Sequence, residues 1–156
     1  MPSFIVEKLA LARRQLRAAR NNLTQNDMET AANRAFLAAE NAAAAAIAKS
    51  GRRARPIHTR IRTDFEELCE KGVIPETFKN LLTESYRFRL RADYGRRVHS
   101  GQTIPELTTD TVQHIIERAS QLIDTVTRMH KPHSRGKRKT EGRKSSERLS
   151  WRQAHV

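Results

Sequence analysis

Cysteine is almost absent from this sequence, because Cys69 is the only one. A single thiol excludes a disulfide within the chain and a zinc site built from cysteines. The six histidines are scattered, and no two of them have the i, i+4 spacing with which a helix presents a pair of metal ligands. We therefore expect neither a metal nor another cofactor.

Long apolar runs are also missing. Residues 1–14 lack the basic-then-apolar order of a signal peptide, and the apolar run at 42–48 is built of alanine and is far too short to cross a bilayer. These two absences predict a soluble cytoplasmic protein with no membrane partner.

No segment shows the strict alternation of apolar and polar residues that indicates a β-strand. Apolar residues instead recur at spacings of three and four, as on one face of a helix. The predicted helices run from about 3 to 23, 27 to 50, 56 to 71, 75 to 94 and 108 or 109 to 129, with Gly51, Gly72 and Gly95 as stop signals and 96–107 as a loop. We predict an all-α fold, an antiparallel bundle of four to five helices over residues 1–130, followed by a basic tail at 131–156.

The second predicted helix is rich in alanine, in the run AANRAFLAAENAAAAAIAK. Alanine favours the helix and lets neighbouring helices approach closely. This pattern suits the central helix of a tight bundle or one half of a helix–helix interface. Glu40 and Asn41 are polar exceptions, which lie either on a solvated side or in a pocket.

The strongest global signal is charge, with a formal net charge of +13 and a pI near 11. Such a balance indicates nucleic acid, an anionic surface or an acidic partner protein, although an arginine-rich proteome also raises the pI of proteins without such partners. The cations expected to contact phosphate are Arg52, Arg53, Arg55, Arg87, Arg91, Arg96, Arg97, Lys137, Arg138 and Lys139.

The tail from residue 131 carries nine Lys or Arg against two Glu, and it contains Trp151, the only tryptophan. It lacks apolar periodicity, so we expect it to be disordered in isolation. Arginines interleaved with an aromatic residue suit docking on a polyanion, whereas the alternative is a solubilising or targeting tail.

The stretch YRFRLRADYGRRVHS, residues 86–100, concentrates five arginines, two tyrosines and His99. Together with the earlier segments ARRQLRAAR, AANRAFLAAENAA and LCEKGVIPETF, it resembles the small stand-alone HEPN proteins of bacteria and archaea. The subgroup that it resembles has an Arg-x-x-Ala-Asp-Tyr element before the last helix, here at 89–94. The resemblance covers about residues 4–129.

The resemblance implies a helical bundle that forms a homodimer and has a nucleotidyltransferase partner, as in toxin–antitoxin pairs. Active members of the family are metal-independent endoribonucleases that use an arginine and, after four to six residues, a histidine. Arg89 matches that arginine, but Tyr94 stands after four intervening residues, and His99 lies after nine. A phenol with a pKa near 10 is a poor base at neutral pH.

Arg89, Tyr94 and His99 are thus the candidate catalytic residues, and Asp93 joins Glu40 and Asn41 as a candidate polar pocket residue. Arg89 and Asp93, at i and i+4, are equally explained by an ion pair on the helix surface. We expect a bundle that binds RNA or a nucleotide-bearing nucleotidyltransferase partner, without the usual ribonuclease activity of the family. The alternatives are a toxin-like endoribonuclease and an accessory protein of a ribonucleoprotein such as the ribosome.

Overall fold

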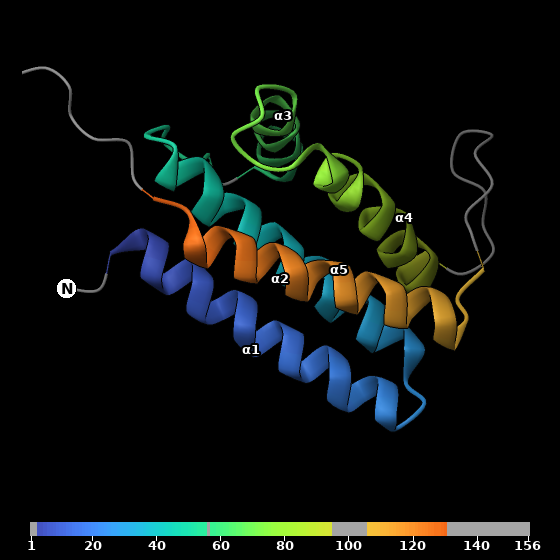
Figure 1. Ribbon diagram of the computed structural model, residues 1–156. Coiled ribbons are helices and arrows are strands. Elements are labelled where there is room, and N and C mark those ends of the chain that lie inside the picture. The colour runs from blue at the N-terminus through green and yellow to red at the C-terminus, as the bar shows by residue number, and fades with distance from the viewer. Residues whose placement is uncertain (1–2, 56, 95–105, 131–156) are drawn as a thin grey trace, which may run out of the picture.

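The computed structural model describes residues 3–55, 57–94 and 106–130, and in these ranges the chain is a bundle of α-helices without strands (Figure 1). The elements are α1 (Phe4–Thr24), α2 (Met28–Lys49), α3 (His58–Glu70), the short 3-10 helix η1 (Glu76–Phe78), α4 (Leu81–Tyr94) and α5 (Thr109–Arg128). The all-α prediction is confirmed. The predicted tail lies outside the described residues.

Helices α1 and α2 form an antiparallel pair joined by a tight turn, as a connection this short requires. Ser3 caps α1 by accepting a hydrogen bond from the Val6 amide, and Asp27 caps α2 by accepting one from the Thr30 amide. Asn26, between the helices, has a φ of 61°, a left-handed conformation that asparagine tolerates better than most residues. Both predicted starts are therefore correct to within a residue.

Helix α2 is the centre of the bundle and packs against α1, α3, α4 and α5. Its alanines at 31, 32, 35, 38, 39 and 42–46 are all at most 2% exposed. The small side chains let four helices approach one axis, which explains why alanine rather than leucine fills this helix. The prediction of a central helix is confirmed, and these alanines leave no surface for a partner because they are already covered within one chain.

Two glycines end helices as predicted. After α2, Gly51 has a φ of 90°, and the amides of Gly51 and Arg52 bond to the carbonyls of Ala48 and Ile47. After α3, Gly72 has a φ of 74°, and its amide bonds to the Cys69 carbonyl in the same way. A residue with a side chain is strained in this left-handed conformation, so glycine is favoured at both positions.

The prediction of one continuous helix from Pro75 is wrong, because the segment forms η1 and then α4, which starts at Leu81. The cause is a tertiary contact. Arg118 of α5 donates to the Thr77 carbonyl at 2.7 Å, and its guanidinium lies 4.5 Å from the centre of the Phe78 ring. In a continuous helix that carbonyl would face the Leu81 amide instead.

Helix α5 starts at a capping box, in which Thr108 and Thr111 exchange hydrogen bonds between side chain and backbone. Thr108, one of the two predicted caps, is the residue that the structure selects. The buried stripe of α5 is Val112, Ile115, Ile116, Ala119, Leu122, Ile123 and Val126. At its other end, the Lys49 ammonium donates to the carbonyls of Val126, Thr127 and Met129.

Candidate nucleic-acid interface

Helix α4 presents Arg87, Arg89 and Arg91, three of the five arginines of the 86–100 stretch, away from the core. Ser85 and Phe88 are buried, so the residues between and after them turn away from the core. Arg87 is exposed, whereas Arg89 and Arg91 are half-buried. The helical period therefore distributes these guanidinium groups over more than one face instead of forming a single patch.

Arg89 lies beside an aromatic cluster formed by α2, α3 and α4. Its guanidinium is 5.1 Å from the centre of the Phe36 ring, within the range of a cation–π interaction. Tyr86 packs on the same ring with centroids 5.6 Å apart and planes at 55°, and the His58 ring is 6.3 Å away. Phe36 thus joins three helices, and its aromatic partners come from two of them.

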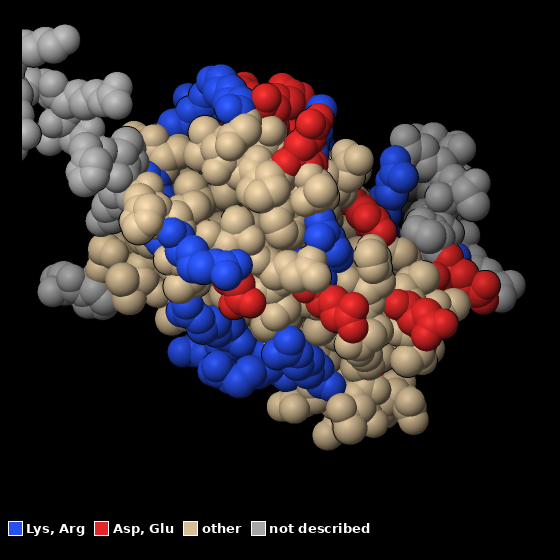
Figure 2. Space-filling model, viewed as in Figure 1, with Lys and Arg blue, Asp and Glu red and all other residues tan. Residues whose placement is uncertain are grey.

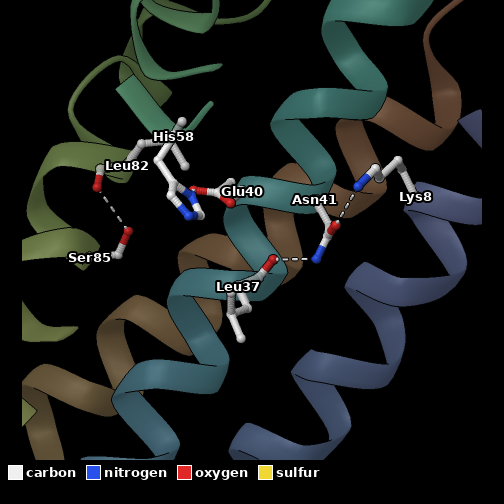
Figure 3. A network of polar contacts seen from close by, with 7 residues as sticks. All are labelled: Lys8, Leu37, Glu40, Asn41, His58, Leu82 and Ser85. Atoms are coloured by element: carbon white, nitrogen blue, oxygen red, sulfur yellow. Dashed lines mark hydrogen bonds and ion pairs between the residues drawn. The ribbon is translucent and has the colours of Figure 1, made fainter. Parts of the chain in front are cut away.

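Glu40 and His58 form the shortest polar contact of this region, 2.6 Å from the carboxylate Oε2 to the ring Nδ1. The Glu40 side chain is only 13% exposed, whereas that of His58 is 60% exposed. Figure 3 shows the two side chains pointing toward each other between α2 and the start of α3. A carboxylate only accepts, so Nδ1 carries the hydrogen and Nε2 is left for another partner.

Asn41, the neighbouring polar exception, points the other way. Its Nδ2 donates to the Leu37 carbonyl at 2.8 Å, and its Oδ1 accepts from Lys8 of α1 at 3.5 Å (Figure 3). Asn41 therefore faces α1, whereas Glu40 faces α3. Of the two, Glu40 alone lies at the aromatic cluster.

A cavity of about 270 Å³ opens between α2, α3 and α4 at this point. Its lining residues are Phe36, Glu40, His58, Thr59, Arg62, Leu82 and Tyr86. We call this cavity the aromatic pocket. It combines apolar walls, aromatic faces, one carboxylate and one guanidinium, a composition typical of ligand sites.

Sequence reasoning did not select Phe36 or His58 as site residues, and it included Arg62 only as the end of a basic segment expected to contact phosphate. A signal was present, since Phe36 and Glu40 are four apart on α2, and His58 and Arg62 are four apart on α3. Each pair therefore lies on one helix face. Nothing in the sequence tells which faces of α2 and α3 meet.

Three of the cations expected to contact phosphate, Arg52, Arg53 and Arg55, lie between α2 and α3. They line a second, wider hollow of about 610 Å³ together with Ala54 and Asp64. Arg52 is bound to Glu67 at 2.7 Å, and this hydrogen bond, with the positive charge of Arg52, lowers the pKa of the Glu67 carboxyl. Asp64 and Glu67 lie on the other flank of α3 from Thr59 and Arg62. The hollow at Arg52, Arg53 and Arg55 is therefore separate from the aromatic pocket.

The remaining predicted site residues divide by position. Asp93 and Tyr94 belong to the last turn of α4. His99, Arg96, Arg97, Lys137, Arg138 and Lys139 lie outside the described residues. The predicted catalytic set of Arg89, Tyr94 and His99 thus stays a prediction.

Charge is unevenly spread over the described surface. Arg13, Arg14, Arg17 and Arg20 are exposed along α1, and Asp110, Glu117 and Asp124 are exposed at intervals of seven along α5. Figure 2 shows basic side chains gathered over α1 and around α3, with acidic side chains in a row over α5. Among the described residues, no three His, Cys, Asp or Glu side chains come together as metal ligands would.

No helix in the described part of the chain is both long and apolar enough to cross a membrane. None of the curated proteins compared with this chain matches it. The family model of the HEPN domain matches residues 6–129, which span α1 to α5 and contain the aromatic pocket. The chain therefore belongs to the HEPN domain family.

Proposed function

We propose that this HEPN protein binds single-stranded RNA at the aromatic pocket and the arginines around it. The observation that carries the proposal is the meeting of Arg62, Arg89 and the Phe36 ring, with the Tyr86 and His58 rings beside them. Proteins that hold single strands combine cations for the phosphates with aromatic faces on which bases stack.

The net charge supports the same proposal. At +13 the chain attracts polyanions, and α4 carries, besides Arg89 at the aromatic cluster, the exposed Arg87 and the half-buried Arg91 on its other sides. Guanidinium groups suit this role because their planar donors match phosphate oxygens and also stack on bases.

The arginines of α1 are less suited to RNA than those around the pocket. Arg13 and Arg20 are engaged across the helix boundary, where they donate to Thr127 and Ser120 of α5. The acidic side chains exposed along that same helix α5 repel phosphate. In addition, the one aromatic residue of α1 is Phe4 at its start, more than two turns away from Arg13, Arg14, Arg17 and Arg20.

Fluorescence anisotropy of a labelled uridine-rich RNA, titrated with the full chain at several salt concentrations, tests the proposal. For single strands the slope of log K against log salt is about −0.7 per phosphate neutralised. We expect a steep slope for the natural chain. The double variant Arg62→Gln, Arg89→Gln should lower the affinity and make the slope shallower by about 0.7 for each of the two arginines that neutralises a phosphate.

The matched control is Arg14→Gln, Arg17→Gln, which removes the same charge from exposed positions of α1. In Figure 1, α1 lies on the opposite side of the bundle from α3. The control should change the affinity less than the pocket variant does. An affinity that stays constant between low and physiological salt would contradict RNA binding, and an equal decrease in both variants would contradict the site.

The homodimer and the nucleotidyltransferase partner implied by the family resemblance stay predictions. If a nucleotidyltransferase is the partner, it must use surface outside the alanines of α2, since these are buried. Co-purification from the native host is the measurement that decides whether such a partner binds.

A further inference from the structure

The aromatic pocket contains a hydrogen-bond acceptor, the Glu40 carboxylate, to which a phosphate cannot donate. Glu40 is a carboxylate in a pocket proposed for an anionic polymer, and on charge alone it opposes binding. Its oxygen Oε2 is bonded to His58, and no hydrogen bond from a described residue reaches Oε1. A carboxylate accepts through both oxygens, so Oε1 and the second lone pair of Oε2 remain available for donors.

The volume of the pocket limits the size of the ligand group that carries those donors. At about 270 Å³ it lies just below the range of about 300–1,000 Å³ that holds drug-sized molecules. It therefore suits one planar ring system rather than a whole nucleotide. Leu82 and Phe36 are buried and supply apolar walls, and the rings of Tyr86 and His58 supply stacking faces.

The four RNA bases differ in what they would present to the Glu40 carboxylate. Guanine carries two adjacent donors on its Watson–Crick edge, the ring N1–H and the amino N2–H, which match two carboxylate oxygens. Adenine and cytosine each pair one amino donor with a ring nitrogen acceptor, and uracil places its N–H between two carbonyl oxygens. In these three bases a lone pair would face a carboxylate, which costs free energy in a partly desolvated site.

We propose that the aromatic pocket holds one guanine base, whose Watson–Crick edge donates to Glu40 while its phosphate contacts Arg62. His58 is a positioning residue, because its Nδ1–H holds the carboxylate in place. The proposal rests on the RNA binding proposed above and adds base specificity to it. Reading an unstacked base by its Watson–Crick edge is a common mode of RNA recognition.

The test compares short uridine-rich RNAs that differ at one central position, bound to the full chain at fixed salt. The RNA with a central guanosine should bind at least about fivefold more tightly than the RNA with adenosine there. Inosine keeps N1–H and lacks the amino group, so its RNA should fall between the two. This comparison uses the natural protein and needs no variant to fold.

Glu40→Gln should abolish the preference for guanosine without weakening the adenosine RNA, because the substitution removes a negative charge from the site. The control is Glu84→Gln, which removes the same charge from an exposed position of α4, and it should keep the preference. A melting curve of each variant verifies the fold. A preference that survives Glu40→Gln would overturn the role of Glu40.

Failure of this proposal is distinguishable from failure of RNA binding. If all three RNAs bind equally and with a steep salt dependence, the guanine pocket is wrong and RNA binding stands. If no RNA binds, both proposals fail. GMP and AMP, titrated alone, distinguish a base within RNA from a free nucleotide. Binding of GMP without binding of the RNAs would overturn the proposal as stated.

Discussion

Cys69 shows how burial changes the chemistry of one residue. Its side chain is 2% exposed on the inner face of α3, and burial raises the pKa of its thiol from the ordinary 9.0 to about 11, with the carboxylate of Glu66 as a further cause. The thiolate is the reactive form, so the folded protein holds this group inert.

We expect the stability of the chain to fall between pH 9 and pH 11 partly because of Cys69. In this window the unfolded chain has released the thiol proton while the folded chain keeps it, so unfolding is favoured as pH rises. The contribution is at most about 1.4 kcal/mol per pH unit. Denaturant unfolding at several pH values, compared with Cys69→Ala, measures it. Equal pH dependence in both proteins would contradict the raised pKa.

Glu40 shows how a charged residue is accommodated next to the buried core. Ala38 and Ala39 before it and the alanines at 42–46 after it are all buried. Because an isolated buried charge is costly, its contact with His58 accounts for how it is tolerated in the fold. The sequence placed Glu40 among its candidates, but the partner on α3 could not be predicted, since it lies 18 residues away in a different helix.

At the scale of elements, local signals decided most boundaries. Ser3, Asp27 and Thr108 mark starts, and Gly51 and Gly72 mark ends, because the geometry of a cap depends on a few neighbouring residues. The wrong prediction was a continuous helix from Pro75, which was based on the preference of proline for the first position of a helix. There, the contacts of Arg118 with Thr77 and Phe78 outweigh local preference.

The end of α5 depends on Lys49, whose ammonium donates to three carbonyls within 3.1 Å. A cation at a helix C-terminus meets both the unpaired carbonyls and the negative end of the helix dipole. Lys49→Met keeps most of the aliphatic stem and removes these bonds. We expect it to lower the free energy of unfolding by about 1–3 kcal/mol.

Amide hydrogen exchange should locate the effect of Lys49→Met in the last turn of α5. The control is Lys71→Met at the exposed C-cap of α3, which should change stability by no more than about 0.5 kcal/mol. If both variants have the same effect, Lys49 does not cap α5.

At the scale of the whole molecule, charge is divided between the bundle and the tail. The tail at 131–156 contains nine of the 30 Lys and Arg residues and two of the 17 Asp and Glu residues, a net +7 of the total +13. Cations of the tail and cations on the helices would contribute to polyanion affinity through the same release of counterions.

A chain that ends at residue 130 should therefore bind RNA more weakly and with a shallower salt slope. The change is about 0.7 for each tail cation that neutralises a phosphate, and about 6 if all nine do so. The preference for a central guanosine should remain, because the aromatic pocket is formed by α2, α3 and α4. Anisotropy titrations of both chains with the guanosine and adenosine RNAs measure the two quantities. An unchanged slope would show that the tail does not contact RNA.

Local patterns along the chain were enough to predict the all-α fold, most helix limits and the buried stripes, because these depend on the spacing of apolar residues and on nearby capping residues. The arginines of 86–100 could also be identified, since their density is visible without a fold. In contrast, the contact of Glu40 with His58, the position of Arg89 over Phe36 and the separation of η1 from α4 appear only in the folded chain. Each of these depends on which faces of the helices meet. Packing around the alanines of α2 determines those faces, and it joins residues too far apart in the sequence for a local pattern to relate them.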